Sequence, residues 1–259
     1  MALHGLYGNG PILFLGTPFL NAVRDYALNP RQQERIMSSV YSMDHKLNVI
    51  RYNTALIQEL EAEDFEKHRE QRFNPNELPR IATYQQRCEF RIHDFDDYLL
   101  FLTLFLESFT AASFSLLDVC GFLLNDIYDL QIIEDKMSYV KAVEELENRK
   151  GSTDPLYQFL MQYRPGNENS VKWIKPLKQI RNAMTHRNIT DVCKHVKQSR
   201  WWFPPTHELH LDDSFFNQGQ NVVVKQFAQE CFEGLEEFVT ELYKRLRIAL
   251  ETDQQIPLY

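Results

Sequence analysis

The sequence predicts an all-α fold: a helical bundle of long antiparallel helices with a small β-hairpin inserted before the last helix. Three observations predict it. Glycine and proline are sparse, at 9 and 11 of 259 residues, which argues against sandwiches, barrels and disordered linkers. Long segments are rich in the helix formers Leu, Glu, Lys and Gln. In those segments apolar residues recur every three or four positions, which is the period of an amphipathic helix.

The N-terminal segment differs from the rest in its density of helix breakers. Residues 1–30 are punctuated by glycine and proline, and we predict an irregular extension there. Residues 31–259 are predicted to form a single helical domain. Its first helix is predicted from Arg31 to Arg72, because neither Gly nor Pro interrupts it. The positions at helical spacing are Ile36, Val40, Met43, Leu47, Ile50, Thr54, Ile57 and Leu60.

A second long helix is predicted to end at Leu130 and to begin near Phe90 or Asp94. Its middle is apolar nearly all round, which places it at the centre of the bundle. The residues concerned are Leu99, Leu100, Phe101, Leu104, Phe105, Phe109, Phe114, Leu116 and Leu117.

Shorter helices are predicted at about 135–149 and 154–163. Ser170 is a suitable N-cap for the helix after them, which is expected to run to about Asn188 and to bend or begin at Pro176.

Residues 198–224 differ in composition from the helical segments on either side. Aromatic residues and a Pro-Pro pair precede alternating polar and apolar residues, which predicts a small hairpin or extended flap. The last helix is predicted from Lys225 to Leu250, where large apolar residues are three or four apart.

Composition also predicts a cytoplasmic protein. No uninterrupted apolar run reaches the ~18 residues that span a bilayer, so no membrane partner is expected. No basic residue precedes the apolar patch at residues 11–20, which argues against a signal peptide. The cysteines have no paired spacing and are interpreted as reduced thiols. They are Cys88, Cys120, Cys193 and Cys231.

The charge is distributed unevenly. The chain has a formal net charge of −8, which argues against broad coating of nucleic acid. Residues 172–200 nevertheless carry eight cations, opposed only by Asp191: Lys172, Lys175, Lys178, Arg181, Arg187, Lys194, Lys197 and Arg200. The pattern indicates a confined anionic ligand, and the alternative is the solvated face of a helix.

One short segment of this basic region has informative helical geometry. Leu177, Ile180 and Met184 form an apolar stripe that faces the core. Asn182 and His186 are four residues apart and share a face. Arg181 precedes His186 by five residues, roughly 140° around the helix. One helix does not easily aim both at one small target, whereas a second copy about a two-fold axis can supply both, so we expect a homodimer.

Arg181, Asn182 and His186 resemble the motif of the HEPN superfamily, in which an Arg and a polar residue precede a His near the end of a bundle helix. The resemblance implies an all-α, usually dimeric protein. Many members are metal-independent ribonucleases, including toxins of toxin–antitoxin pairs and effectors of phage defence, and others bind without cleaving. A toxin branch often has Tyr two residues after the His, where this chain has Asn188, so we do not assign it to that branch.

The residue types suit RNA cleavage without a metal. His186 can exchange protons near neutral pH, and Arg181 presents a planar cationic fork to phosphate oxygens. Asn182 would hold the imidazole or contact the phosphate. Substrate binding is assigned to Lys172, Lys175, Lys178 and Arg187. The structural alternative is that His186 complements the helix dipole and Arg181 is a buried or surface salt-bridge partner.

An acidic partner for Arg181 is expected on the central helix. Glu107 and Asp118 belong to a narrow stripe of polar or small residues there. A carboxylate inside a bundle needs a cation, so either residue is a candidate supporting acid, with a structural or a catalytic role.

Two further patterns are weaker. Four potential zinc ligands, Cys193, His195, His207 and His210, fit no common zinc-finger spacing, and we expect neither a metal nor another cofactor. The aromatic residues 201–203 beside basic residues could stack on unpaired bases, or pack against the bundle.

The sequence therefore predicts a HEPN-like protein that binds RNA or a nucleotide. We expect it to act as a metal-independent endoribonuclease through a dimeric Arg/His cleft, leaving a 2′,3′-cyclic phosphate. The alternatives are a non-catalytic HEPN-like module for nucleotide, RNA or protein, and a helical scaffold without an active site. An antitoxin-type protein is a further expected partner.

Overall fold

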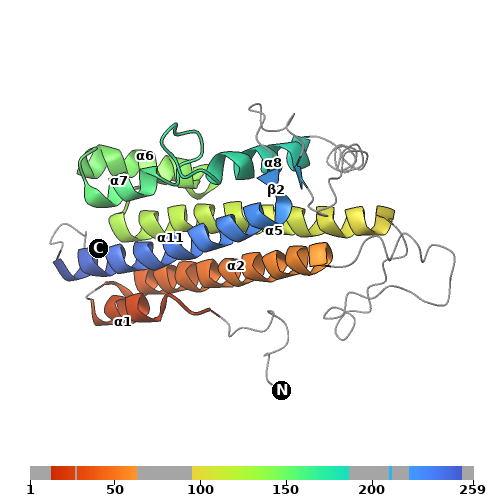
Figure 1. The fold of residues 1–259 in the computed structure, drawn as a ribbon. Coiled ribbons are helices and arrows are strands. Elements are labelled where there is room, and N and C mark those ends of the chain that lie inside the picture. Colours follow the sequence, from red (N-terminus) through yellow and green to blue (C-terminus); the bar gives the residue numbers. More distant parts are fainter. Residues whose placement is uncertain (1–12, 27, 63–94, 187–209, 212–221, 253–259) are drawn as a thin grey trace, which may run out of the picture. The chain divides into compact units, whose positions relative to one another are not determined.

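The computed structural model describes residues 13–26, 28–62, 95–186, 210–211 and 222–252 (Figure 1). Most of these residues are helical, and the predicted all-α fold is confirmed. The α-helices are α1 (Thr17–Asp25), α2 (Pro30–Ala62), α5 (Phe95–Tyr128), α6 (Tyr139–Lys150), α7 (Pro155–Met161), α8 (Ile174–His186) and α11 (Val224–Thr252). A 3-10 helix, η2 (Glu134–Lys136), precedes α6, and two short strands, β1 (His210–Leu211) and β2 (Val222–Val223), precede α11.

The chain divides into two compact units, each built from segments far apart in sequence. Unit 1 comprises Met1–Ile50, Ala111–Lys175 and Cys231–Tyr259, and unit 2 comprises Arg51–Thr110 and Pro176–Glu230. The helices α2, α5, α8 and α11 each contribute residues to both units. The domain boundary at residue 31 stays a prediction.

Helix α2 begins one residue before its predicted start. Asn29 caps it, since its side-chain oxygen accepts the Gln32 N–H at 2.9 Å, and Pro30 suits the first helical position. The predicted core stripe is confirmed: Ile36, Val40, Met43, Leu47, Ile50 and Ile57 are all fully buried. Residues 63–72, predicted to continue this helix, lie outside the described part.

Helix α5 is a core helix, as predicted. Its buried residues in unit 1 include Leu116, Leu117, Cys120, Leu123, Leu124 and Ile127. One residue of its apolar middle, Leu104, is 44% exposed. Among the described helices, only α5 is long and apolar enough to cross a membrane, over Phe101–Tyr128. Because 56% of the qualifying window is buried inside the protein, this is weak evidence for a membrane span.

The prediction of an irregular segment over residues 1–30 is wrong for Thr17–Asp25, which forms α1. Pro18 lies in the first turn of α1, where its missing N–H breaks no intrahelical bond, so here it begins a helix. Phe19 is buried and stacks on Tyr243 of α11 with ring centroids 5.7 Å apart. Helix α1 is therefore part of the core of unit 1.

Two buried polar residues of α2 hold the entry to α1. Asp44 accepts the Gly16 N–H at 3.1 Å and the Tyr243 hydroxyl at 3.3 Å. Asn48 accepts the N–H of Leu13 and donates to its carbonyl, both at 2.9 Å. Buried polar groups need such partners, and these contacts fix the backbone that leads into α1.

The burial of Asp44 predicts a pH dependence of stability. Desolvation raises the pKa of its carboxyl, opposed by the hydrogen bonds from Gly16, Tyr243 and Leu15. A pKa that is higher in the folded state means that the contribution of Asp44 to stability is greatest at acid pH and falls as pH rises through the folded pKa. An Asp44→Asn variant lacks this titration. In urea unfolding from pH 4 to 7, we expect the free energy of unfolding of the wild type to fall relative to the variant as pH rises. A constant or opposite difference would contradict this.

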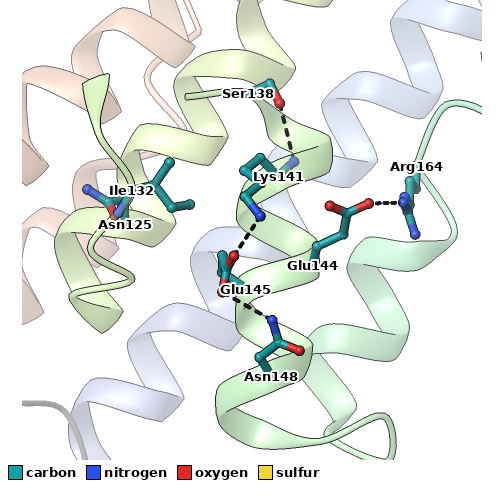
Figure 2. A network of polar contacts seen from close by, with 8 residues as sticks. All are labelled: Asn125, Ile132, Ser138, Lys141, Glu144, Glu145, Asn148 and Arg164. Atoms are coloured by element: carbon teal, nitrogen blue, oxygen red, sulfur yellow. Dashed lines mark hydrogen bonds and ion pairs between the residues drawn. The ribbon is translucent and has the colours of Figure 1, made fainter. Parts of the chain in front are cut away.

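Helices α6 and α7 are short, and side chains fix their ends. The Ser138 hydroxyl accepts the Lys141 N–H at 3.2 Å at the start of α6, as Figure 2 shows, and Asp154 caps α7. Gly151 ends α6 with φ 85°, a conformation that favours glycine. The predicted segment 135–149 therefore contains most of η2 and most of α6, and 154–163 contains α7.

An aromatic cluster joins α6, α7 and α11 within unit 1. The ring of Phe238 lies 5.7 Å from Phe159, 6.1 Å from Tyr139 and 4.6 Å from Tyr163, measured between centroids. Trp173 extends the cluster through Tyr163.

Helix α8 begins at Ile174, between the two predicted starts, which were just after Ser170 and at Pro176. Ser170 is not its N-cap, because α8 starts at Ile174 and the Ser170 hydroxyl instead donates to the Asn167 carbonyl at 2.8 Å. The intervening Trp173 is buried against Gly234, where a β-carbon would lie 2.2 Å from the indole nitrogen. The turn and this close contact keep residues 170–173 out of the helix.

Unit 2 combines polar and aromatic contacts between helices. Phe109 of α5 and Phe227 of α11 meet edge to face at 6.3 Å, and the side chains of Gln58 and Gln229 are 2.5 Å apart. Strands β1 and β2 pair antiparallel inside the predicted hairpin segment. The last helix, predicted from Lys225 to Leu250, is confirmed within two residues at each end as α11.

Candidate functional site

The candidate site lies on α8, whose packing face agrees with the predicted stripe. Ile174, Leu177 and Ile180 are buried, and these positions recur at helical spacing, so one side of α8 contacts the core. The side chain of Met184, the last residue of the predicted stripe, is outside the described part.

Arg181 and Asn182 are both exposed. Arg181 follows Leu177 by four residues and lies only about 40° from it around the helix, yet Leu177 is fully buried. The core contact that covers Leu177 therefore does not reach Arg181. This exposure contradicts a buried ion pair for Arg181, whereas the alternative of a surface salt bridge stays a prediction.

Helix α8 ends at His186. The position of His186 is thus one helical turn beyond Asn182 and about 140° from Arg181, as the spacing predicts. Its side chain is outside the described part, so its contacts stay a prediction. Because Arg181 and His186 lie in different directions around a single regular helix, one copy of α8 does not easily aim both at one small target. A second copy is therefore still expected.

The predicted substrate-binding cations follow the same segment. Lys172 and Lys175 are exposed and Lys178 is half-buried, while Arg187 lies outside the described residues. The sequence has no acidic residue between Glu168 and Asp191, and the first turn of α8 contains none. An acid-free helix with exposed cations is a suitable surface for an anionic ligand.

Comparison with known proteins identifies the family. A sequence profile described as Cthe2314-like HEPN matches residues 78–242, more than half of the chain. The chain belongs to this HEPN family. The matched range contains Arg181, Asn182 and His186, whereas α1 and the whole of α2 precede it. No curated protein and no solved structure matches the chain significantly.

The two candidate supporting acids of this HEPN protein lie in different units. Asp118 belongs to unit 1, where it accepts the backbone N–H of Tyr139 at 3.3 Å and so holds the start of α6. Glu107 is half-buried on the part of α5 in unit 2, the unit that also contains Arg181. Pairing of Arg181 with either acid stays a prediction.

The weaker zinc pattern cannot be followed in the structure, because residues 193, 195 and 207 and the side chain of His210 lie outside the described part. The aromatic residues 201–203 lie outside it as well. Among the residues that the structure describes, no group of three or more His, Cys, Asp or Glu side chains is placed to hold a metal ion.

Sequence reasoning missed the polar interior of the HEPN unit that contains Arg181. Asn53 of α2 is 4% exposed and donates to the Ser108 hydroxyl at 3.1 Å. The Gln58–Gln229 pair joins α2 to α11 in the same unit. The available signal for this polar interior was that polar residues lie close to the apolar stripe of a helix. It was missed because hydrophobic periodicity counts only apolar positions.

Proposed function

We propose that this HEPN protein binds RNA at the C-terminal end of α8 and cleaves it without a metal ion. The observation that carries the proposal is the exposure of the consecutive residues Arg181 and Asn182 on an acid-free basic helix that ends at His186. Family membership supports the same conclusion, because the profile match includes this segment.

The proposed reaction is an internal transesterification. The 2′-oxygen of a ribose attacks the adjacent phosphorus and loses its proton to one imidazole. The bond to the 5′-oxygen breaks, and a second proton donor protonates that oxygen. The products are a 2′,3′-cyclic phosphate and a 5′-hydroxyl, so no cofactor is consumed. Arg181 stabilises the additional negative charge on the phosphorane oxygens, and His186 transfers protons.

The proposed cleft requires two copies of the chain. Because Arg181 and His186 lie about 140° apart around α8, a second α8 related by a two-fold axis supplies the complementary pair. Two His186 side chains then provide the proton acceptor and the proton donor. Size measurement in solution should accordingly give a dimer.

We also propose a cytoplasmic location and a role in a toxin–antitoxin or defence system. Cys120 and Cys231 are buried cysteines outside any disulfide, which supports a reducing compartment. The proposed biological role rests on the resemblance to HEPN members that are toxins or defence effectors. In such a system, the partner would be an antitoxin-type protein that covers the end of α8.

The proposal is tested with the purified chain and mixed RNA in EDTA. We expect cleavage products with 2′,3′-cyclic phosphate ends. Binding should weaken steeply with salt, and Arg181→Ala should lower the slope of log K against log salt by about 0.7, the loss of one phosphate contact on a single strand. Arg24→Ala removes an exposed cation from α1 and serves as the matched control.

Other results would change the conclusion. If RNA binds in a salt-dependent way but stays intact, the protein is a non-catalytic binding module and not an endoribonuclease. Neither binding nor cleavage would leave a helical scaffold.

A further inference from the structure

Helix α1 has no capping side chain of its own. It has nine residues, and a helix this short is marginal in water unless other parts of the protein hold it. Its N-cap residue is Gly16, which has no side chain to accept a hydrogen bond, and its first turn contains no acidic residue. The groups that hold the two ends of α1 therefore come from outside the helix.

Helix α2 supplies these groups within the same unit. At the N-terminal end of α1, the Asp44 carboxyl accepts the backbone N–H groups of Gly16 and Leu15, and negative charge is favourable at a helix N-terminus. At the other end, the side-chain amide of Gln33 donates to the Val23 carbonyl at 3.0 Å. All of these residues belong to unit 1.

The contact between α1 and α2 is close enough to bury the Asp44 carboxyl. A β-carbon at Gly16 would lie 2.2 Å from Cγ1 of Val40 and 3.2 Å from a carboxyl oxygen of Asp44, so the backbone at Gly16 packs directly on α2. Phe19 stacks on the ring of Tyr243, whose hydroxyl donates to the same carboxyl. Asp44 is consequently 3% exposed.

Neutral groups of two other elements face Asp44. They are the backbone N–H groups that lead into α1 and the Tyr243 hydroxyl of α11. Burial raises the pKa of the Tyr243 phenol, and it also raises the pKa of the thiol of Cys120 in α5, which acts on Tyr243. Both groups therefore stay protonated near neutral pH. An ionised Asp44 is held by neutral donors, and burial makes its charged form costly.

Docking of α1 is linked to the protonation of this carboxyl. Burial in the docked state raises the pKa of Asp44, against the effect of its hydrogen bonds. When α1 detaches, the carboxyl returns to water and its pKa returns toward the ordinary value. The docked state therefore binds the proton more readily, and loss of the proton as pH rises favours the detached state.

The extent of the buried surface of α1 favours local detachment. Its buried residues are Phe19, Leu20 and Val23, whereas the aromatic cluster of unit 1 is formed by residues of α6, α7 and α11 and by Tyr163 and Trp173. Elements with few buried contacts open at a lower free energy than the core to which they are attached.

From this geometry we propose that α1 is a pH-sensitive strap, which detaches from α2 and α11 while the rest of unit 1 stays folded, and detaches more often when Asp44 is charged. Detachment uncovers α2 at Val40 and the ring of Tyr243. Residues 26–29 keep α1 tethered to α2. The inference is independent of the proposed function, because all of its residues lie in unit 1 and none belongs to the RNA site.

Hydrogen exchange of the full chain, followed by mass spectrometry, measures the detachment. Peptides from α1 and from α6 are compared between pH 4 and pH 7, after correction for the pH dependence of the intrinsic exchange rate. We expect the ratio of detached to docked α1 to rise with pH by up to about tenfold per pH unit, the limit for a single proton. Peptides from α6 should show no such rise.

Two variants separate the charge of Asp44 from the packing of α1. In Asp44→Asn the amide oxygen can accept the Gly16 N–H, and the amide NH₂ can donate to the Tyr243 oxygen, whose hydrogen then goes to the Val40 carbonyl at 3.2 Å. The detached fraction of α1 should not depend on pH in this variant. Gly16→Ala should detach α1 at every pH, because the added methyl group meets Val40. Val40→Ala in the same chain removes that contact and should restore part of the protection.

Two results would overturn the strap. A rise of equal size in the peptides of α6 would mean that unit 1 unfolds as a whole. A rise in α1 that persists in Asp44→Asn would assign the pH dependence to another group. Neither result affects the RNA site, which is tested separately by binding and cleavage.

Discussion

Replacing His186 with alanine is expected to lower the rate of RNA cleavage by about 10²–10⁴-fold, the usual contribution of general acid–base catalysis by one side chain. In the proposed dimer the substitution removes both the proton acceptor and the proton donor, because each copy supplies one imidazole. Arg181→Ala is expected to act on the same step by removing charge stabilisation. Single-turnover rates with a defined RNA in EDTA measure both effects.

Two controls make the His186 prediction specific. Binding of 2′-fluoro RNA should change little in the His186→Ala variant, since the phosphate contacts are assigned to other residues. His45→Ala removes an exposed histidine from α2 and should retain the wild-type rate. A His186→Ala variant that cleaves at the wild-type rate would exclude the catalytic role, even if RNA binding were intact.

Phe238→Ala is expected to lower the free energy of unfolding more than any other substitution proposed for this protein. Phe238 is completely buried and its ring lies within 6.1 Å of three other aromatic rings, those of Tyr139, Phe159 and Tyr163. Replacing such a residue with alanine removes buried apolar surface and leaves a cavity, at a cost of about 3–5 kcal/mol. Urea unfolding of the full chain, followed by near-ultraviolet circular dichroism, measures the change.

The chain offers a matched control for this substitution. Phe14 is 60% exposed, and Phe14→Ala should change the free energy of unfolding by no more than about 0.5 kcal/mol, as is usual for surface positions. Phe238→Leu keeps most of the volume and should cost less than the alanine variant. Equal effects of Phe14→Ala and Phe238→Ala would show that the aromatic cluster does not stabilise unit 1.

Helix positions could be predicted from the sequence where local signals, such as caps and apolar periodicity, agree with the packing of the core. Helices α2 and α11 begin within one residue of their predicted starts. At α2, the Asn29 cap and Pro30 coincide with the onset of the apolar stripe. The first helix, α1, was missed because its proline was interpreted as a breaker. Its core contacts are with α2 and with Tyr243, more than 200 residues away, and no local pattern records them.

The candidate site was predictable in part. The spacing of Arg181, Asn182 and His186 and the apolar stripe beside them follow from the sequence, since a regular helix converts spacing into direction. The exposure of Arg181 did not follow, because Leu177 at nearly the same angle is buried. Only the extent of the packing partner decides which of two such residues is covered.

By itself, the sequence determined the all-α class, the bundle helices, the basic segment and the motif that resembles HEPN, because these depend on periodicity, composition and local spacing. The tertiary structure decided that Thr17–Asp25 is a helix of the core, that α8 starts at Ile174 rather than near Ser170, and that Arg181 and Asn182 face solvent. The physical reason is that burial and hydrogen bonding of a residue depend on distant partners. The Gly16–Asp44 bond and the Gly234–Trp173 contact each join residues that are far apart in the chain.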